Sequence, residues 1–150
     1  MKETPQDKSL EERLGASKFS GEGFLGTDHR PVDEIVADDL RTLERLGVPP
    51  AKLLAALRNA FEKARAALGG EVEIRPGVTA LAHESMGRIP SPFRGDGVFE
   101  KGDVVLSSAA GEQIVLTALG LAMIEKHSFF QGHGSRYRIE PTRAAALLGL

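Results

Sequence analysis

The first strong apolar pattern covers residues 31–46. Apolar side chains recur there every three or four positions, the spacing that places them along one face of a helix. Pro31 suits a first helical turn, where its missing N–H is not needed, and Gly47 is typical of the position after a helix end. We therefore predict a helix over 31–46 with a stripe of Val32, Ile35, Val36, Leu40, Leu43 and Leu46.

A second helical stripe follows almost immediately, from Pro50 to about Leu68. Gly69 and Gly70 end the pattern, because glycine terminates helices readily. Only residues 47–49 separate the two predicted helices, so we expect them to pack as a hairpin or to meet at a sharp corner. The second stripe consists of Leu53, Leu57, Phe61, Ala64 and Leu68.

Short β-patterns come next. Residues 71–75 alternate apolar and polar side chains, Pro76 and Gly77 have the composition of a type II turn, and residues 78–83 return as a second strand. Residues 87–102 then contain two prolines and four glycines. We predict an irregular loop there, and loops of that length are uncommon and often functional.

Residues 103–107 and 112–116 predict a second hairpin, with its turn at 108–111. An alternative interpretation joins residues 109–127 into one helix. The runs Val104–Leu106 and Ile114–Leu116 are short and rich in β-branched side chains, which favours the hairpin. Thr117 can then cap a helix over residues 118–127.

The remaining residues predict a third hairpin and a closing helix. Its strands are residues 128–131 and 135–140, joined by a turn at residues 132–134, and the helix covers residues 142–148. The predicted fold class is therefore α+β, with an N-terminal helical hairpin packed on short antiparallel β-hairpins and one or two further helices.

A chain of 150 residues is the size of one ordinary domain and can bury a core without a disulfide or metal. Residues 1–23 are polar and contain three glycines. We predict a flexible N-terminal arm over 1–23, with a short helix at 9–14, and a single α+β domain over 24–150.

Composition narrows the class of protein. The chain has no cysteine, which removes disulfides, thiol catalysis and cysteine-based zinc sites and fits a reducing cytoplasm. Its 19 Lys and Arg against 21 Asp and Glu give none of the basic excess of a dedicated nucleic-acid binder. The longest nearly apolar run, 114–124, falls short of the roughly 20 residues that span a bilayer. We expect a cytoplasmic protein without a membrane segment.

The densest chemistry lies in residues 127–138. In a strand, alternate side chains share a face, so Arg136 and Arg138 should stand side by side and point outward. Two neighbouring guanidinium groups can hold a phosphate or carboxylate through paired hydrogen bonds, and a glycine turn adds backbone N–H groups. The predicted site for an anionic small molecule or a partner protein consists of Arg136, Arg138, His127, His133 and Tyr137.

Plainer interpretations of the same residues remain open. The two arginines can form a solvated strand face, with Arg138 paired to Glu140 or Glu125. His127 can simply be a histidine favoured at a helix C-terminus. The histidine spacing matches neither a helical metal-binding pair nor a zinc finger, and no serine lies in a nucleophile elbow. We therefore predict no metal, no cofactor and no catalytic residue.

Residues 43–56 resemble the bacterial helix-turn-helix. Gly47 stands at the turn, Leu43 and Leu53 occupy its apolar positions, and Ala56 occupies its small position. The apolar residue at the position of Leu43 is usually a small one, and prolines begin the second helix where a Ser or Thr cap is usual. The resemblance implies contacts from the second helix to DNA phosphates.

The succession of a helix at 118–127 and a glycine-tipped basic hairpin at 128–140 is similar to a winged helix with its wing. A three-helix core leading into it is not evident in the sequence. This partial resemblance also implies DNA binding.

Three further segments resemble a group of uncharacterised bacterial proteins. They are Leu-Gly-Thr-Asp-His-Arg at 25–30, Pro-Ser-Pro-Phe at 90–93 and His-Ser-Phe-Phe-Gln-Gly-His-Gly-Ser-Arg-Tyr-Arg at 127–138. The likeness spans most of residues 25–141. It implies an intact single domain and no particular activity.

The favoured hypothesis is a cytoplasmic binding or regulatory domain, not an enzyme, which meets an anionic small molecule or a partner protein through the C-terminal hairpin. A homodimer is a further candidate assembly. The alternative is a DNA-binding protein of the helix-turn-helix or winged-helix kind, and the third hypothesis is a hydrolase or metal-dependent enzyme.

Overall fold

The computed structural model describes Leu10 and residues 23–150. The predicted N-terminal arm and its short helix therefore lie outside the described residues, apart from Leu10 and Gly23. Along the chain the elements are α2 (Val32–Leu46), α3 (Pro50–Ala66), β1 (Val72–Arg75), β2 (Val78–Pro90), β3 (Val98–Ser108), β4 (Gln113–Thr117), α4 (Ala118–His127) and α5 (Pro141–Leu147).

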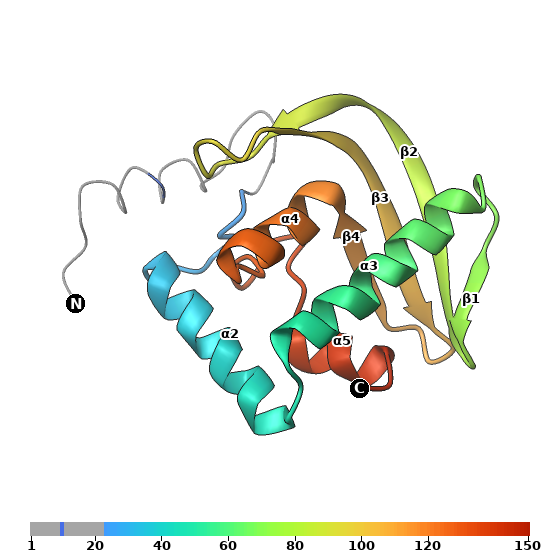
Figure 1. Cartoon of the computed structure of the whole chain (residues 1–150), viewed down its shortest axis with the longest axis horizontal. Helices are drawn as coiled ribbons and strands as arrows, with labels where there is room; N and C mark the ends of the chain where they lie inside the picture. The colour runs from blue at the N-terminus through green and yellow to red at the C-terminus, as the bar shows by residue number, and fades with distance from the viewer. Residues whose placement is uncertain (1–9, 11–22) are drawn as a thin grey trace.

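The strands form one antiparallel sheet in the order β1-β2-β3-β4. Figure 1 shows β2 and β3 as the two long strands, which arch beyond β1 and β4 and curve over the helices. Helices α3 and α4 pack on the same sheet, mainly against β2 and β3. The predicted α+β class is confirmed.

The two helices predicted first are both present, and they meet at a corner. Gly47 closes α2 in the left-handed conformation, and Val48 N–H donates to the carbonyl of Leu43 at 3.0 Å. Figure 1 shows α3 diverging from α2 to lie across the sheet, whereas α2 lies near α5. The sharp corner is therefore the correct alternative, because α3 buries its stripe against the strands.

The prediction of an irregular loop at 87–102 is wrong. The β2–β3 ladder continues through the pairs Arg88 with Glu100, Ile89 with Phe99 and Pro90 with Val98, so the loop shrinks to residues 91–97. Pro90 stands at the last rung, where its missing N–H costs little. We call this extension, residues 83–103, the arm. It is distinct from the predicted N-terminal arm at residues 1–23.

The prediction of a third hairpin at 128–140 is also wrong, because this segment contains no strand. Ser128 and Gln131 have positive φ angles of 54° and 73°, which extended strands do not adopt. The segment instead crosses residues 23–28. Gly132 N–H donates to the carbonyl of Phe24 at 2.8 Å, and the N–H of Thr27 donates to the carbonyl of His133 at 2.9 Å.

Helix α4 lies between two apolar clusters. Its residues 119–124 are all buried, as expected for a helix that is apolar on every side. Leu121 and Ile124 join the larger cluster with α3, the sheet and α5, while Leu119 and Met123 join a smaller one. That smaller cluster also contains Phe24, Val32, Ile35, Phe93 and Phe129.

The crossing of residues 23–28 with the C-terminal segment leaves no room for a side chain at Gly132. A Cβ there would lie 2.4 Å from the Leu25 carbonyl oxygen and 2.9 Å from the Asp28 Cβ. We predict that Gly132→Ala lowers the free energy of unfolding by about 3 kcal/mol, the upper range for overpacking, because backbone must move.

The control for this experiment is Gly111→Ala. Gly111 has φ +90° and no heavy atom within 4 Å of the added methyl group, so only backbone strain of about 1 kcal/mol is expected. Chemical denaturation of both variants measures the difference. Equal losses in the two variants would show that the crossing is not tightly packed.

Candidate functional site

Arg138, which was predicted to point outward, is buried in an ion-pair network. Its Nη1 donates to Asp39 Oδ2 at 2.9 Å and to the carbonyl of Gln131 at 2.6 Å. Its Nη2 donates to Asp39 Oδ1 at 2.7 Å and to Glu140 at 2.8 Å. The Arg138 and Asp39 side chains are only 7% and 4% exposed. The predicted clamp of two free arginines is therefore not formed.

The plainer interpretation of Arg138 is confirmed in part. Glu140 does pair with Arg138, whereas Glu125 pairs with Arg58 on α3. Burial on its own lowers the pKa of Arg138, but the hydrogen bonds and charges of Asp39 and Glu140 outweigh burial and raise that pKa. The Nε atom is buried and has no hydrogen-bond partner among the described residues. Arg138 thus fastens the C-terminal segment to α2.

Three of the predicted site residues lie on the turns at 133–134 and 136–137. His133 and Arg136 are exposed and Tyr137 is half-buried. The Arg136 guanidinium stacks over the Tyr137 ring, 5.3 Å from its centre. Ligand binding by these three residues stays a prediction, now without Arg138 beside them.

His127 holds the loop of the arm against the end of α4. Its Nε2 lies 2.6 Å from Asp96 Oδ2, and its ring stacks on Phe93 with centres 3.8 Å apart and planes 12° apart. Phe93 in turn contacts Phe129 edge to face. His127 therefore connects α4, residues 91–97 and the smaller apolar cluster, and its position in the last turn of α4 fits a helix-end histidine.

A second ion-pair network lies ahead of α2. The Arg30 guanidinium donates to both carboxylate oxygens of Asp28, at 2.9 and 2.7 Å, and to Asp38 at 3.2 Å. The backbone N–H of His133 also donates to Asp28, at 3.1 Å. The hydrogen bond from Arg30 is the largest cause that holds the pKa of Asp28 well below its ordinary value.

A groove of about 800 Å³ runs between the C-terminal end of α3 and the arm. Phe61, Arg65 and Leu68 line it from the α3 side, and residues 82–85, 87, 88 and 100–103 line it from the strands. Sequence reasoning missed the groove, because it predicted a loop at 87–102. Its α3 side comes from residues 61–69, distant from the arm in the sequence, so no local pattern reveals it.

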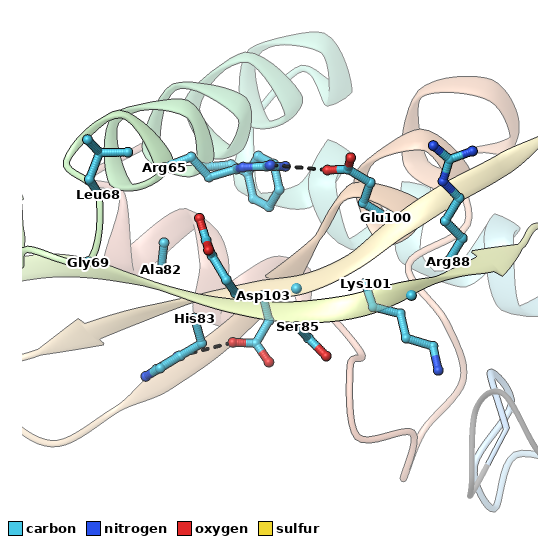
Figure 2. A pocket seen from close by; sticks show the side chains of 14 residues that line it. Arg65, Leu68, Gly69, Ala82, His83, Ser85, Arg88, Glu100, Lys101 and Asp103 are labelled. Carbon is cyan, nitrogen blue, oxygen red and sulfur yellow. Dashed lines mark hydrogen bonds and ion pairs between the residues drawn. The ribbon is translucent and has the colours of Figure 1, made fainter.

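The groove carries charged side chains of both signs on the side that faces α3. Arg65 donates to Glu100 at 3.2 Å and lies over the Phe61 ring. Arg88 stands opposite Glu100 in the ladder and shares its face. Figure 2 shows Arg65, Glu100 and Arg88 on one side of the arm, and the strand register places Glu84, opposite Gly102, on the same face.

The other side of the arm carries a pair of His83 and Asp103. The His83 Nδ1 lies 3.2 Å from Asp103 Oδ1, which makes an exposed pair. Figure 2 places this pair with Ser85 and Lys101, away from Arg65. The bulge in β2 separates the two halves of the ladder here, since the register shifts between Glu84 and Arg88.

The structure also bears on the alternative hypotheses. Leu43 and Leu53 of the helix-turn-helix-like segment are fully buried, and the predicted wing at 128–140 is not a hairpin. Among the described residues, no three His, Asp or Glu side chains lie together as metal ligands, and no helix is long and apolar enough to cross a membrane.

Comparison with protein-family models, curated proteins and solved structures gave no match.

The Arg138 network should be essential for stability. We predict that Asp39→Ala lowers the free energy of unfolding by about 3–5 kcal/mol, because it leaves a buried guanidinium without its main partner. The exposed pair of Arg58 and Glu125 is the control, and Glu125→Gln should cost at most about 1 kcal/mol. Thermal or chemical denaturation measures both, and similar losses would contradict the assigned role of Arg138.

The Asp28 network should make stability depend on acid pH. A carboxylate with a depressed folded-state pKa stabilises the fold above the unfolded value near 3.8, and this stabilisation is lost as the pH falls below it. We predict that Asp28→Asn costs on the order of 2 kcal/mol at neutral pH and flattens the loss of stability below about pH 4. Parallel pH curves for the variant and the wild type would contradict this.

Proposed function

We propose that the protein is a binding domain, not an enzyme, and that it takes up an extended, acid-bearing segment of a partner polypeptide in the groove between α3 and the arm. The proposal keeps the ligand class and the cytoplasmic location expected from the sequence. It moves the contact surface from residues 127–138 to the groove.

The observation that carries the proposal is the open edge of β2. Strand β1 pairs only with Val78, Thr79 and Ala80, so beyond Ala80 this edge of β2 has no neighbouring strand among the described residues. The groove lies along that stretch. An extended peptide can add a strand to such an edge, with backbone hydrogen bonds for affinity and side-chain contacts for specificity.

Charge supports an acidic occupant. Arg65 is paired with Glu100, whereas Arg88 forms no ion pair among the described residues, so a carboxylate from the partner can bind Arg88. A charge-assisted hydrogen bond of this kind contributes about 1.5–3 kcal/mol.

Apolar side chains at the rim support a polypeptide over a small ion. Leu68 is 86% exposed and Met86 is 96% exposed, the two most exposed large apolar side chains among the described residues. Leu68 also has a φ of 52°, a conformation that costs a non-glycine residue about 1 kcal/mol. Both side chains stay exposed in the isolated chain. An apolar side chain of a bound partner would bury them.

A pair of synthetic peptides tests the proposal. Each is about eight residues long, a normal strand length, and alternates valine with either glutamate or lysine. We expect fluorescence anisotropy to show binding of the glutamate peptide only. Replacing Arg65 and Arg88 together by alanine should weaken this binding at least about tenfold, which corresponds to roughly 1.4 kcal/mol.

The matched control is Arg41→Ala. Arg41 is an exposed arginine on α2, and its side chain is 62% exposed against 52% for Arg65. This variant should bind the glutamate peptide like the wild type. If neither peptide binds, or if the Arg65 and Arg88 substitutions have no effect, the groove is not the contact surface.

A further inference from the structure

The bulge of β2 forms a symmetric charge pattern around one exposed side chain. Glu84 stands opposite Gly102 and Arg88 stands opposite Glu100, while residues 85–87 between them have no partner in the ladder. Gly102 and Glu100 are alternate residues of β3, so Glu84 and Arg88 share a face of the arm. Met86 is the midpoint of this segment.

This pattern is complementary to itself. When two identical strands meet antiparallel about a two-fold axis at Met86, Glu84 of each copy lies opposite Arg88 of the other. Two ion pairs then flank a contact between the two Met86 side chains. A parallel arrangement would place Glu84 against Glu84 and Arg88 against Arg88, which like-charge repulsion disfavours.

We propose that the segment bound at the groove is the β2 bulge of a second copy of this chain, so that the protein forms a two-fold symmetric dimer through its arms. This inference rests on the proposed function, because Glu84 of the second copy is then the acid that Arg88 binds. Among the described residues, Glu84 and Arg88 form no ion pair within the chain, which leaves both free for the contact.

The two-fold axis at Met86 lies beside the groove. Ser85 and Gly87, on either side of Met86, line the groove together with Leu68. A two-fold axis through the bulge therefore brings Met86 of each copy next to the groove of the other. The two exposed thioethers pack against each other at the axis, and both leave water.

Single-cysteine cross-linking tests the position of the axis, because the chain has no cysteine of its own. A disulfide requires Cα atoms within about 7 Å. We expect M86C to form a disulfide-linked dimer rapidly under mild oxidation. The control is L46C at the end of α2, which is 43% exposed and should stay largely monomeric.

Charge reversal tests the partners. E84R and R88E should each weaken dimerisation at least about tenfold in sedimentation experiments on the full chain, because each creates two like-charge contacts. An equimolar mixture of E84R and R88E should dimerise again, since one strand then carries two arginines and the other two glutamates. Because R88E also faces Glu100 across the ladder, M86D gives a second disruption that reverses no charge, and it should also be monomeric.

The outcomes separate this inference from the proposed function. A wild-type chain that stays monomeric at high concentration but binds the glutamate peptide would overturn the dimer and leave the groove as a site for another partner. A dimer that tolerates E84R, R88E and M86D would also overturn it. Failure of both self-association and peptide binding would overturn both proposals.

Discussion

The ion pair of Arg138 with Asp39 is the constraint on which the C-terminal third of the fold depends. Both side chains are almost fully buried, and a buried charge is tolerated only when its hydrogen bonds are met. Asp39 therefore fixes the place where residues 131–140 run against α2. The same segment supplies the backbone that crosses residues 23–28, so one ion pair aligns the two ends of the described domain.

The regular elements could be predicted from the sequence because their signals are local. The stripe of α2, the proline and glycine at its ends, and the corner at residues 47–49 all act over a few residues. The β1–β2 turn and the β3–β4 hairpin have equally local signals. The arm was missed because its prolines and glycines were interpreted as a loop, whereas Ile89 and Phe99 pack against the smaller cluster and keep the strands extended.

The candidate site was harder to predict, because it depends on contacts between distant residues. Alternation along 135–140 suggested that Arg136 and Arg138 share an outward face, but the positive φ angles at Ser128 and Gln131 belong to a path set by contacts with residues 23–28. Asp39 is 99 positions from Arg138, and no pattern near Arg138 reveals it. The groove likewise combines the end of α3 with a bulge whose position only the strand register defines.

Burial divides the charged residues into two groups with different roles. Arg138, Asp39 and Asp28 are held inside by several hydrogen bonds each, so their contribution is to stability and to the path of the chain. Arg88 and Glu84 lie on an exposed strand edge, and they form no ion pair that would stabilise the described fold. The nearby Leu68 and Met86 expose apolar surface to water, which is unfavourable, and no contact inside the described chain buries it. Charged and apolar groups that do not stabilise the isolated domain, gathered at one unpaired strand edge, favour recognition of another chain there over a structural role.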